Sequence, residues 1–429
     1  MQKVLIIAYY WPPAGGPGVQ RWLKFVSYLR DFGIEPIVFV PENPNYPIVD
    51  ESLVDEIPEG IKVLKQPIFE PYGIAKIFSK KSTEKISSGI IEDEKKQNLL
   101  QQLLLFIRGN FFIPDARKFW VKPSVKYLES YIKKNNINTI ITTGPPHSLH
   151  LIGLQLKQKL GVNWLADFRD PWTSIGYHEK LKLTKKASAK HKALEKQVLQ
   201  EASHIITTSF KTKEEFLALT STEISVITNG YEKQALLKKN NSAKKFTIAH
   251  IGSLLSERNP IALWQALAEI IEENNDFKKL FQLQLIGKVS GQVFQSIKKA
   301  GLKNHAINIG YVSHLKAIEF QQQAQVLLLL EIDRPETEAI IPGKLFEYLA
   351  AKRPIIAIGP KAWDVSKILA EVKMTPPFLY DEKEKIKQEI LKYFNDFQQN
   401  SLEVSSEGIE KYSRKNLTKN LAEILRHYA

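Results

Sequence analysis

Glycine clusters follow apolar runs at several points of the sequence, and the first lies in WPPAGGPGVQRW. There Gly15, Gly16 and Gly18 stand between a strand-like run and a helical pattern. At such a junction, backbone N–H groups and a helix N-terminus can bind an anion such as phosphate. A tight turn from strand to helix is the alternative, and the spacing differs from the G-x-G-x-x-G dinucleotide motif.

A second candidate phosphate loop, IGSLLSERNP, places Gly252 and Ser253 at a strand end and Arg258 just before a helical pattern. A guanidinium is permanently charged and offers a planar fork of donors, so Arg258 could clamp a diphosphate. A solvated loop arginine is the alternative.

A third segment, IIPGKLFEYLAAKRPIIAIG, has Gly343 and Lys344 at an expected helix start and Glu347 one turn later. The N–H groups and the ammonium suit a phosphate, and the carboxylate can accept hydrogen bonds from vicinal hydroxyls such as those of a ribose. The Walker pattern is absent, because no glycine stands at the required spacing upstream.

Acidic and imidazole side chains follow two other strand patterns. ADFRDPW carries Asp167, Arg169 and Asp170, and paired acids suit proton transfer or hydroxyl binding, with an Asp–Arg ion pair as the alternative. GPPHSLH adds His147 and His150, three residues apart and without a third ligand. We therefore expect no metal site.

The elements that must position these residues alternate between short apolar runs and helical patterns, which indicates βα units around parallel sheets. The first series of predicted strands is Lys3–Tyr10, Glu35–Val40, Asn138–Thr143, Asn163–Phe168 and Ser203–Ser209. The second series is Phe246–Ser253, Phe281–Gly287, Ala306–Val312, Ala324–Glu331 and Arg353–Gly359. The expected fold is α/β, with two doubly wound Rossmann-like domains facing each other across an interdomain cleft that holds the ligand.

The predicted N-terminal domain covers 1–233 and the C-terminal domain 234–405, with a polar linker at Ala235–Lys245 and a final segment at 406–429. An insertion at about 72–126 interrupts the first series. It contains an apolar helical stripe and then aromatic residues, which could lie on a membrane interface or pack on their own domain. The stripe and aromatics are Leu99, Leu100, Leu103, Leu104, Ile107, Phe111, Phe112, Phe119 and Trp120.

Composition excludes several classes of protein. The chain has 429 residues, 60 Lys and Arg against 46 Asp and Glu, and no cysteine, which excludes disulfides and thiol chemistry and makes the cytoplasm the default compartment. No apolar run approaches the roughly 20 residues that span a bilayer. The charge of +14 is regional, because residues 101–200 hold 17 Lys and Arg against 6 Asp and Glu. Such a charge suits nucleic acid, an anionic membrane or phosphorylated ligands.

Taken in order, these segments resemble family 4 glycosyltransferases of the GT-B fold, especially bacterial surface-polysaccharide members. The segments that carry the resemblance are YYWPPAGGPGVQR, TTGPPHSLH, DFRDPW, ITNGY, IGSLLSERNP and IPGKLFEYLAAKRPIIAIG. The resemblance implies transfer of a sugar, with retention of configuration, from a nucleotide-diphosphate donor to an acceptor that is lipid-linked or a saccharide. It also implies a metal-independent peripheral protein at the cytoplasmic face of the plasma membrane, and a final helix that crosses back to the first domain.

The same resemblance assigns roles to individual residues. Arg258 would bind the diphosphate, the backbone of the Gly343 segment would meet it, and Glu347 would hold the ribose. The implied donor-binding residues are Gly15, Gly16, Gly252, Ser253, Arg258, Gly343, Lys344, Leu345 and Glu347. The implied acceptor-side residues are Arg21, Asp115, His147 and Arg169.

Two positions depart from the family pattern. The first glutamate of its Glu-x7-Glu motif would stand at Ala339, with Glu338 one residue away, and Arg169 replaces a strand-end histidine. For assistance to the acceptor hydroxyl we therefore expect Asp170 first and Asp167 next, while Arg258 and Lys344 would stabilise the leaving diphosphate.

Two other functions remain open. A sugar-nucleotide 2-epimerase shares the architecture and the ligand. A non-enzymatic polyanion-binding protein would use the basic and aromatic stretch ARKFWVKPSVKY, although no nucleic-acid motif accompanies it and we expect no nucleic-acid partner.

Overall fold

A computed structural model describes residues 1–71, 99–232, 244–405 and 407–428. Two units emerge, one formed by Met1–Asn229 with Arg414–Ala429 and the other by Gly230–Ser413. Most of the sequence-predicted linker and the first part of the predicted insertion lie outside the described residues. No helix within the described ranges is long and apolar enough to cross a membrane.

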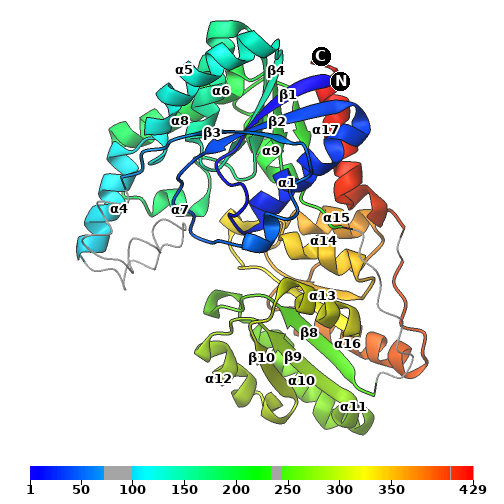
Figure 1. The fold of residues 1–429 in the computed structure, drawn as a ribbon. Helices are drawn as coiled ribbons and strands as arrows, with labels where there is room; N and C mark the ends of the chain where they lie inside the picture. Colours follow the sequence, from blue (N-terminus) through cyan, green and yellow to red (C-terminus); the bar gives the residue numbers. More distant parts are fainter. Residues whose placement is uncertain (72–98, 233–243, 406, 429) are drawn as a thin grey trace. The chain divides into compact units, whose positions relative to one another are not determined.

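The N-terminal unit is built on a sheet of seven strands in the order β3-β2-β1-β4-β5-β6-β7, and every described pair is parallel (Figure 1). The strands are β1 (Gln2–Ile7), β2 (Ile34–Pro41), β3 (Lys62–Gln66), β4 (Thr139–Gly144), β5 (Asn163–Phe168), β6 (His204–Thr207) and β7 (Ile224–Val226). The helices are α1 (Pro17–Leu29), α4 (Leu99–Phe111), α5 (Lys118–Asn135), α6 (Ser148–Leu160), α7 (Gly176–Glu179), α8 (Lys185–Glu201), α9 (Phe210–Leu217) and α17 (Arg414–Arg426).

Two apolar cores cover the two faces of this sheet, because successive side chains of a strand point to opposite faces. In β1, Leu5 and Ile7 belong to the core with α5, α6 and α8. Val4 and Ile6 belong to the core with α1 and α17. The last helix of the chain is thus part of the N-terminal unit.

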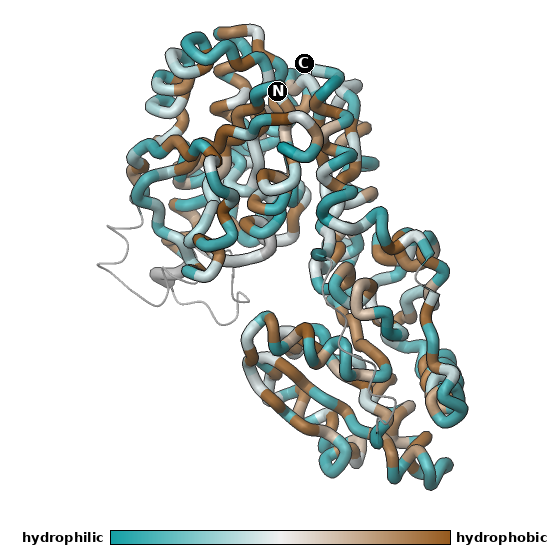
Figure 2. The backbone as a smooth tube through the Cα atoms, turned by 45° about the vertical axis from the view of Figure 1, so that its right-hand side comes forward, coloured by the Kyte–Doolittle hydropathy of each residue, from teal (hydrophilic) through white to brown (hydrophobic). Residues whose placement is uncertain are grey.

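The C-terminal unit has a five-stranded parallel sheet in the order β10-β9-β8-β11-β12. Its strands are β8 (Phe246–Ile251), β9 (Phe281–Ile286), β10 (Ala306–Gly310), β11 (Val326–Leu330) and β12 (Ile355–Ile358). Its helices are α10 (Ile261–Glu273), α11 (Asn275–Leu280), α12 (Gly291–Lys299), α13 (His314–Gln323), α14 (Gly343–Ala350), α15 (Val365–Glu371) and α16 (Lys383–Gln398). Figure 2 shows hydrophobic segments inside this unit, and the side chains of β8 and β11 are buried along their whole length.

The described part of the predicted insertion contains α4 and the first residues of α5. Among the α4 side chains that the structure describes, Leu105 is buried, Leu104 and Ile107 are half-buried, and Leu103 is 54% exposed. The helix packs closely through Gly109, where a Cβ would lie 2.6 Å from Leu183 Cδ2. Trp120 is a core residue that contributes nothing to an exposed surface, because it is buried by stacking on Phe39 at 5.0 Å.

Candidate functional site

The predicted donor residues of the C-terminal unit gather at the carboxyl ends of β8 and β11. From β8 the chain moves outward to β9 and β10, and it then returns to the other side of β8 with β11 and β12. Ligands of open parallel sheets bind at such a switch point, outside the carboxyl ends of the strands. The loops after both strands and the N-terminus of α14 supply the side chains.

The loop after β8 needs two glycines. Gly252 has φ +121° and Gly287 has φ +118°, conformations that L side chains rarely adopt. The Gly252 N–H donates to the Ile286 carbonyl at 2.8 Å, and a Cβ on Gly287 would lie only 2.4 Å from the Gly252 carbonyl oxygen. This packing fixes the backbone at Gly252, while the neighbouring Ser253 is exposed.

Lys344 lies in the first turn of α14 and points back to the end of β8. Its Nζ donates to the Ile251 carbonyl at 3.4 Å. Burial lowers the pKa of Lys344 to about 8, assisted by the charge of Arg258 and opposed by Glu331 and Glu347. A cation at a helix N-terminus next to a glycine loop is a favourable place for a phosphate.

Gly343 and Leu345, the neighbours of Lys344, contribute backbone rather than side chain. Gly343 has open space where a Cβ would stand. The Leu345 side chain is fully buried, and its N–H donates to the Pro342 carbonyl at 2.9 Å.

Arg258, in the short 3₁₀ helix Ser256–Arg258, is held by an acid that sequence reasoning missed. Its Nε and Nη2 donate to the same oxygen of Glu331, at 3.0 and 2.7 Å. Glu331 directly follows β11 and is 1% exposed. The only signal in the sequence is an acid at the end of the apolar run VLLLL.

Glu347 already has two partners on α13. His314 Nε2 lies 3.0 Å from its Oε1, and Gln321 Nε2 donates to its Oε2 at 2.8 Å. These two contacts orient the Glu347 carboxylate near Lys344, one of the residues expected to bind the diphosphate. Glu338 lies in the turn after the 3₁₀ helix Pro335–Thr337, where its carbonyl accepts from the Asp364 N–H at 2.9 Å.

In the N-terminal unit, the first glycine loop connects β1 to α1. Gly16 is the N-cap of α1 and has φ +110°. The Gly15 N–H is already used, because it donates to the Ile48 carbonyl at 3.0 Å. Gly18 faces Arg169, whose Nη1 would lie 1.6 Å from a Cβ at that position.

Asp167 is fully buried and satisfied at the end of β5. Its carboxylate accepts from Arg21 Nη2 at 3.1 Å, from Trp22 Nε1 at 2.9 Å and from Thr143 Oγ1 at 2.7 Å. These contacts hold the carboxyl ends of the central strands β4 and β5 to α1. A carboxylate with three donors and no exposure is suited to structure rather than to contact with a substrate.

Asp170, three residues later, lacks such donors. Within the described residues its carboxylate makes no hydrogen bond or ion pair. Burial raises its pKa, against the opposing charge of Arg169. Arg169 is itself turned toward β4, where its Nε donates to the Gly144 carbonyl at 3.2 Å.

The remaining predicted acceptor-side residues support the local fold. Asp115 caps α6, accepting from the Ser148 N–H at 2.9 Å and the Ser148 hydroxyl at 2.8 Å. His147 is buried and stacks on Trp172 at 5.2 Å, and burial lowers its pKa well below 6.5.

No group of three or more potential metal-ligating side chains occurs in the part of the chain that the structure describes.

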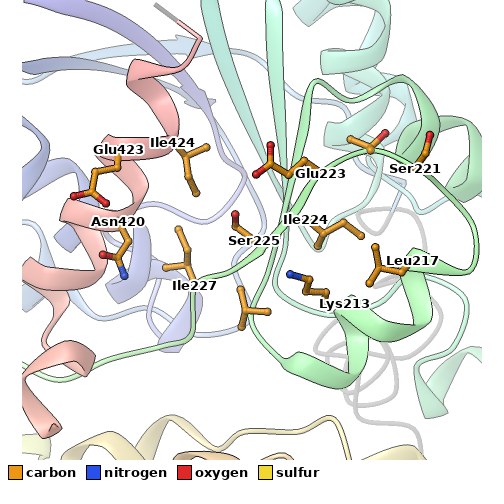
Figure 3. Close-up of a pocket in the computed structure, with 12 residues that line it drawn as sticks. Lys213, Leu217, Ser221, Glu223, Ile224, Ser225, Ile227, Asn420, Glu423 and Ile424 are labelled. Atoms are coloured by element: carbon orange, nitrogen blue, oxygen red, sulfur yellow. The ribbon is translucent and has the colours of Figure 1, made fainter.

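A cavity of about 770 Å³ lies elsewhere in the N-terminal unit, beside the edge strand β7 (Figure 3). Residues of α9 and of α17 form its walls, including Lys213 and Asn420. None of the sequence-predicted site residues lines it. It is therefore separate from the candidate donor site.

The two parallel sheets with their covering helices form a GT-B fold, which the solved structures of similar proteins share. The chain is similar over its full length to sucrose-phosphate synthase of Thermosynechococcus elongatus (TM-score 0.61, 14% identity, 99% of that chain). It is also similar to HepE of Anabaena in complex with UDP (TM-score 0.60, 15% identity, the whole of both chains).

A third similar structure is described as a putative UDP-N-acetylglucosamine 2-epimerase from Listeria monocytogenes (TM-score 0.55, 11% identity, 99% of this chain and 96% of that chain). No model of a known protein family matches the sequence, and no curated protein sequence is significantly similar to it. The similarities therefore define the fold.

Proposed function

We propose that the protein is a glycosyltransferase that moves a sugar from a nucleotide-diphosphate donor to a hydroxyl of an acceptor. The observation that carries this proposal is the grouping of Arg258, Lys344 and Glu347 at the switch point of the C-terminal sheet. Two cations suit a diphosphate, and a carboxylate one turn away suits the two hydroxyls of a ribose. The similar structure of HepE in complex with UDP supports a nucleotide ligand.

The proposed chemistry rests on charge. As the bond between the sugar and the diphosphate breaks, negative charge grows on the leaving oxygens, and Arg258 and Lys344 stabilise it. We propose that these cations take the place of a metal, and that configuration is retained, with the leaving diphosphate able to accept the proton of the acceptor hydroxyl. Asp170 is our candidate for assisting that hydroxyl, because among the described residues it is an acid without a hydrogen-bond partner whose pKa burial raises.

The acceptor and location are proposed from a surface of the N-terminal unit. Phe69, Phe111 and Phe119 are 61%, 63% and 44% exposed. Phe119 contacts Phe69 and Phe112, and Lys118 Nζ lies 5.2 Å from the Phe119 ring. Aromatic side chains with adjacent cations suit an anionic membrane surface. We propose a peripheral protein of family 4 type that acts on a lipid-linked acceptor in surface-polysaccharide assembly at the cytoplasmic face of the plasma membrane.

The second candidate is a sugar-nucleotide 2-epimerase, favoured by the similar structure that carries that description. Product analysis separates the two. A transferase releases nucleoside diphosphate and extends an acceptor, whereas an epimerase releases the 2-epimer without an acceptor. A polyanion-binding protein would instead bind DNA in a salt-sensitive way and show no affinity for nucleotide sugars.

The first experiment is a thermal-shift screen against nucleotide sugars with different bases and sugars. We expect nucleotide sugars that share one base to raise the melting temperature, because a ligand that binds only the folded state stabilises it. Stabilisation should be lost in Arg258→Ala. The absence of any shift with every nucleotide sugar would contradict the proposal.

A further inference from the structure

The contact between Glu331 and Arg258 uses one edge of the guanidinium and leaves the other edge open. A guanidinium has five N–H donors, and Glu331 takes one from Nε and one from Nη2. In the residues that the structure describes, Nη1 makes no hydrogen bond. Three N–H groups therefore remain, two on Nη1 and one on Nη2. One N–H of each nitrogen forms the open edge, which can bind two phosphate oxygens.

Glu331 is itself fixed by the fold. Its Oε1 also accepts from the Ile332 N–H at 2.9 Å, and its carbonyl accepts from the Tyr380 hydroxyl at 2.7 Å. The side chain is 2% exposed, whereas that of Arg258 is 27% exposed. A buried acid anchored at a strand end can thus orient a more mobile arginine from the neighbouring loop.

We propose that Glu331 is a positioning residue of the donor site, which orients Arg258 so that its open edge meets the diphosphate of the nucleotide. This inference rests on the proposed function and adds to it a residue that neither the motifs nor the resemblance indicated. Without Glu331, Arg258 would sample several rotamers on an exposed loop, and ordering it would oppose binding.

Charge alone predicts the opposite effect. Glu331 is an anion next to a site for an anion, so its removal should strengthen diphosphate binding if only Coulomb attraction mattered. If orientation of Arg258 dominates, its removal weakens binding. The sign of the change in affinity therefore distinguishes the two roles.

The chain offers a matched control in the adjacent ion pair. Glu257 precedes Arg258 in the chain, and its Oε1 accepts from Arg334 Nη2 at 2.6 Å. This pair joins the same two loops but is 43% and 50% exposed. Exposed pairs contribute little to stability. Glu257→Gln removes one acid from the same loop without touching Arg258's partner.

The test is calorimetric titration of the full-length protein with UDP, and with GDP and ADP as further probes. We expect Glu331→Leu to weaken binding about tenfold, the effect of losing a hydrogen bond to a charged group, and Glu257→Gln to change it less than about twofold. In an Arg258→Ala background, Glu331→Leu should have no further effect, because Glu331 acts through Arg258. Equal or tighter binding by Glu331→Leu, or an undiminished loss in the Arg258→Ala background, would overturn the inference.

Glu331→Gln provides a second variant that keeps the size and one acceptor of the side chain. We expect it to weaken binding less than Glu331→Leu, because its side-chain oxygen can still accept a hydrogen bond from Arg258. Binding by Glu331→Gln as weak as that by Glu331→Leu would argue against the positioning role. If the wild type binds none of the diphosphates, the proposed function fails; if it binds and Glu331→Leu binds equally, only the positioning role fails.

Discussion

Gly287 packs so tightly against Gly252 that a Cβ on Gly287 would lie 2.4 Å from the Gly252 carbonyl oxygen. The contact joins the ends of β8 and β9, directly beside the Lys344 ammonium, which lies 3.6 Å from a Cβ position on Gly252. The backbone of the candidate donor loop is therefore set by two residues without side chains.

Substitution at this contact tests the loop's role. We expect Gly287→Ala to lower the free energy of unfolding by about 3 kcal/mol, because the new methyl group meets backbone and φ is positive. Diphosphate affinity should fall with it. Gly291→Ala, where a Cβ meets nothing within 4 Å, is the control and should change stability by less than about 0.5 kcal/mol. Chemical denaturation measures both; equal stability of the two variants would contradict the packing argument.

The pH dependence of donor binding should follow Lys344. Because burial lowers the pKa of this lysine to about 8, its ammonium is present below pH 8 and is lost as the pH rises through that value. We therefore expect diphosphate affinity to fall between about pH 7.5 and pH 9, well before an ordinary lysine with pKa about 10.4 would titrate. Titrations across this range in the wild type and in Lys344→Arg, which stays charged, measure the effect. A fall that persists in Lys344→Arg would assign the titration to another group.

The two acids of ADFRDPW should respond differently to conversion to asparagine. Asp167→Asn breaks a fully buried pair with Arg21, so we expect a loss of about 3 kcal/mol or more in the free energy of unfolding. Asp170→Asn removes a carboxylate whose charged form burial disfavours, so the fold should keep its stability while kcat falls about 100-fold or more. Denaturation curves and initial rates separate these effects. Full activity of Asp170→Asn would remove it from the mechanism.

Membrane association should depend on the exposed phenylalanines. We expect Phe111→Ser with Phe119→Ser to reduce sedimentation with vesicles that contain phosphatidylglycerol, because each substitution removes apolar surface from the interface. Leu217→Ser, on α9 and 53% exposed, is the control for loss of an exposed apolar side chain. Equal sedimentation of all variants, or equal binding to neutral phosphatidylcholine vesicles, would contradict the proposed surface.

Much of the fold followed from the sequence because apolar runs and helical patterns alternate clearly. The central strands of both sheets lie where they were predicted, and the GT-B architecture is confirmed. The edge strands β3 and β7 were not predicted. The pattern of Lys62–Gln66 is largely polar and Ile224–Val226 is only three residues long, so neither gives a strong periodic signal.

The candidate site was only partly predictable, for a physical reason. Motifs identify residues that are close in sequence, such as Gly343, Lys344 and Glu347. Glu331 and Arg258 are 73 positions apart, and His314 is 33 positions from Glu347, so only the fold reveals these pairs. The burial of Asp167 is likewise set by α1 and β4, which its own motif does not contain.

The most direct test of the proposed donor site is calorimetric titration of the nucleoside diphosphate that the thermal-shift screen selects. We predict micromolar binding by the wild type and a loss of about tenfold or more in both Arg258→Ala and Glu347→Ala, with melting temperatures near that of the wild type. The first variant removes the open guanidinium edge and the second removes the carboxylate proposed to hold the ribose. Wild-type affinity in both folded variants would contradict a nucleotide-diphosphate site at the ends of β8 and β11.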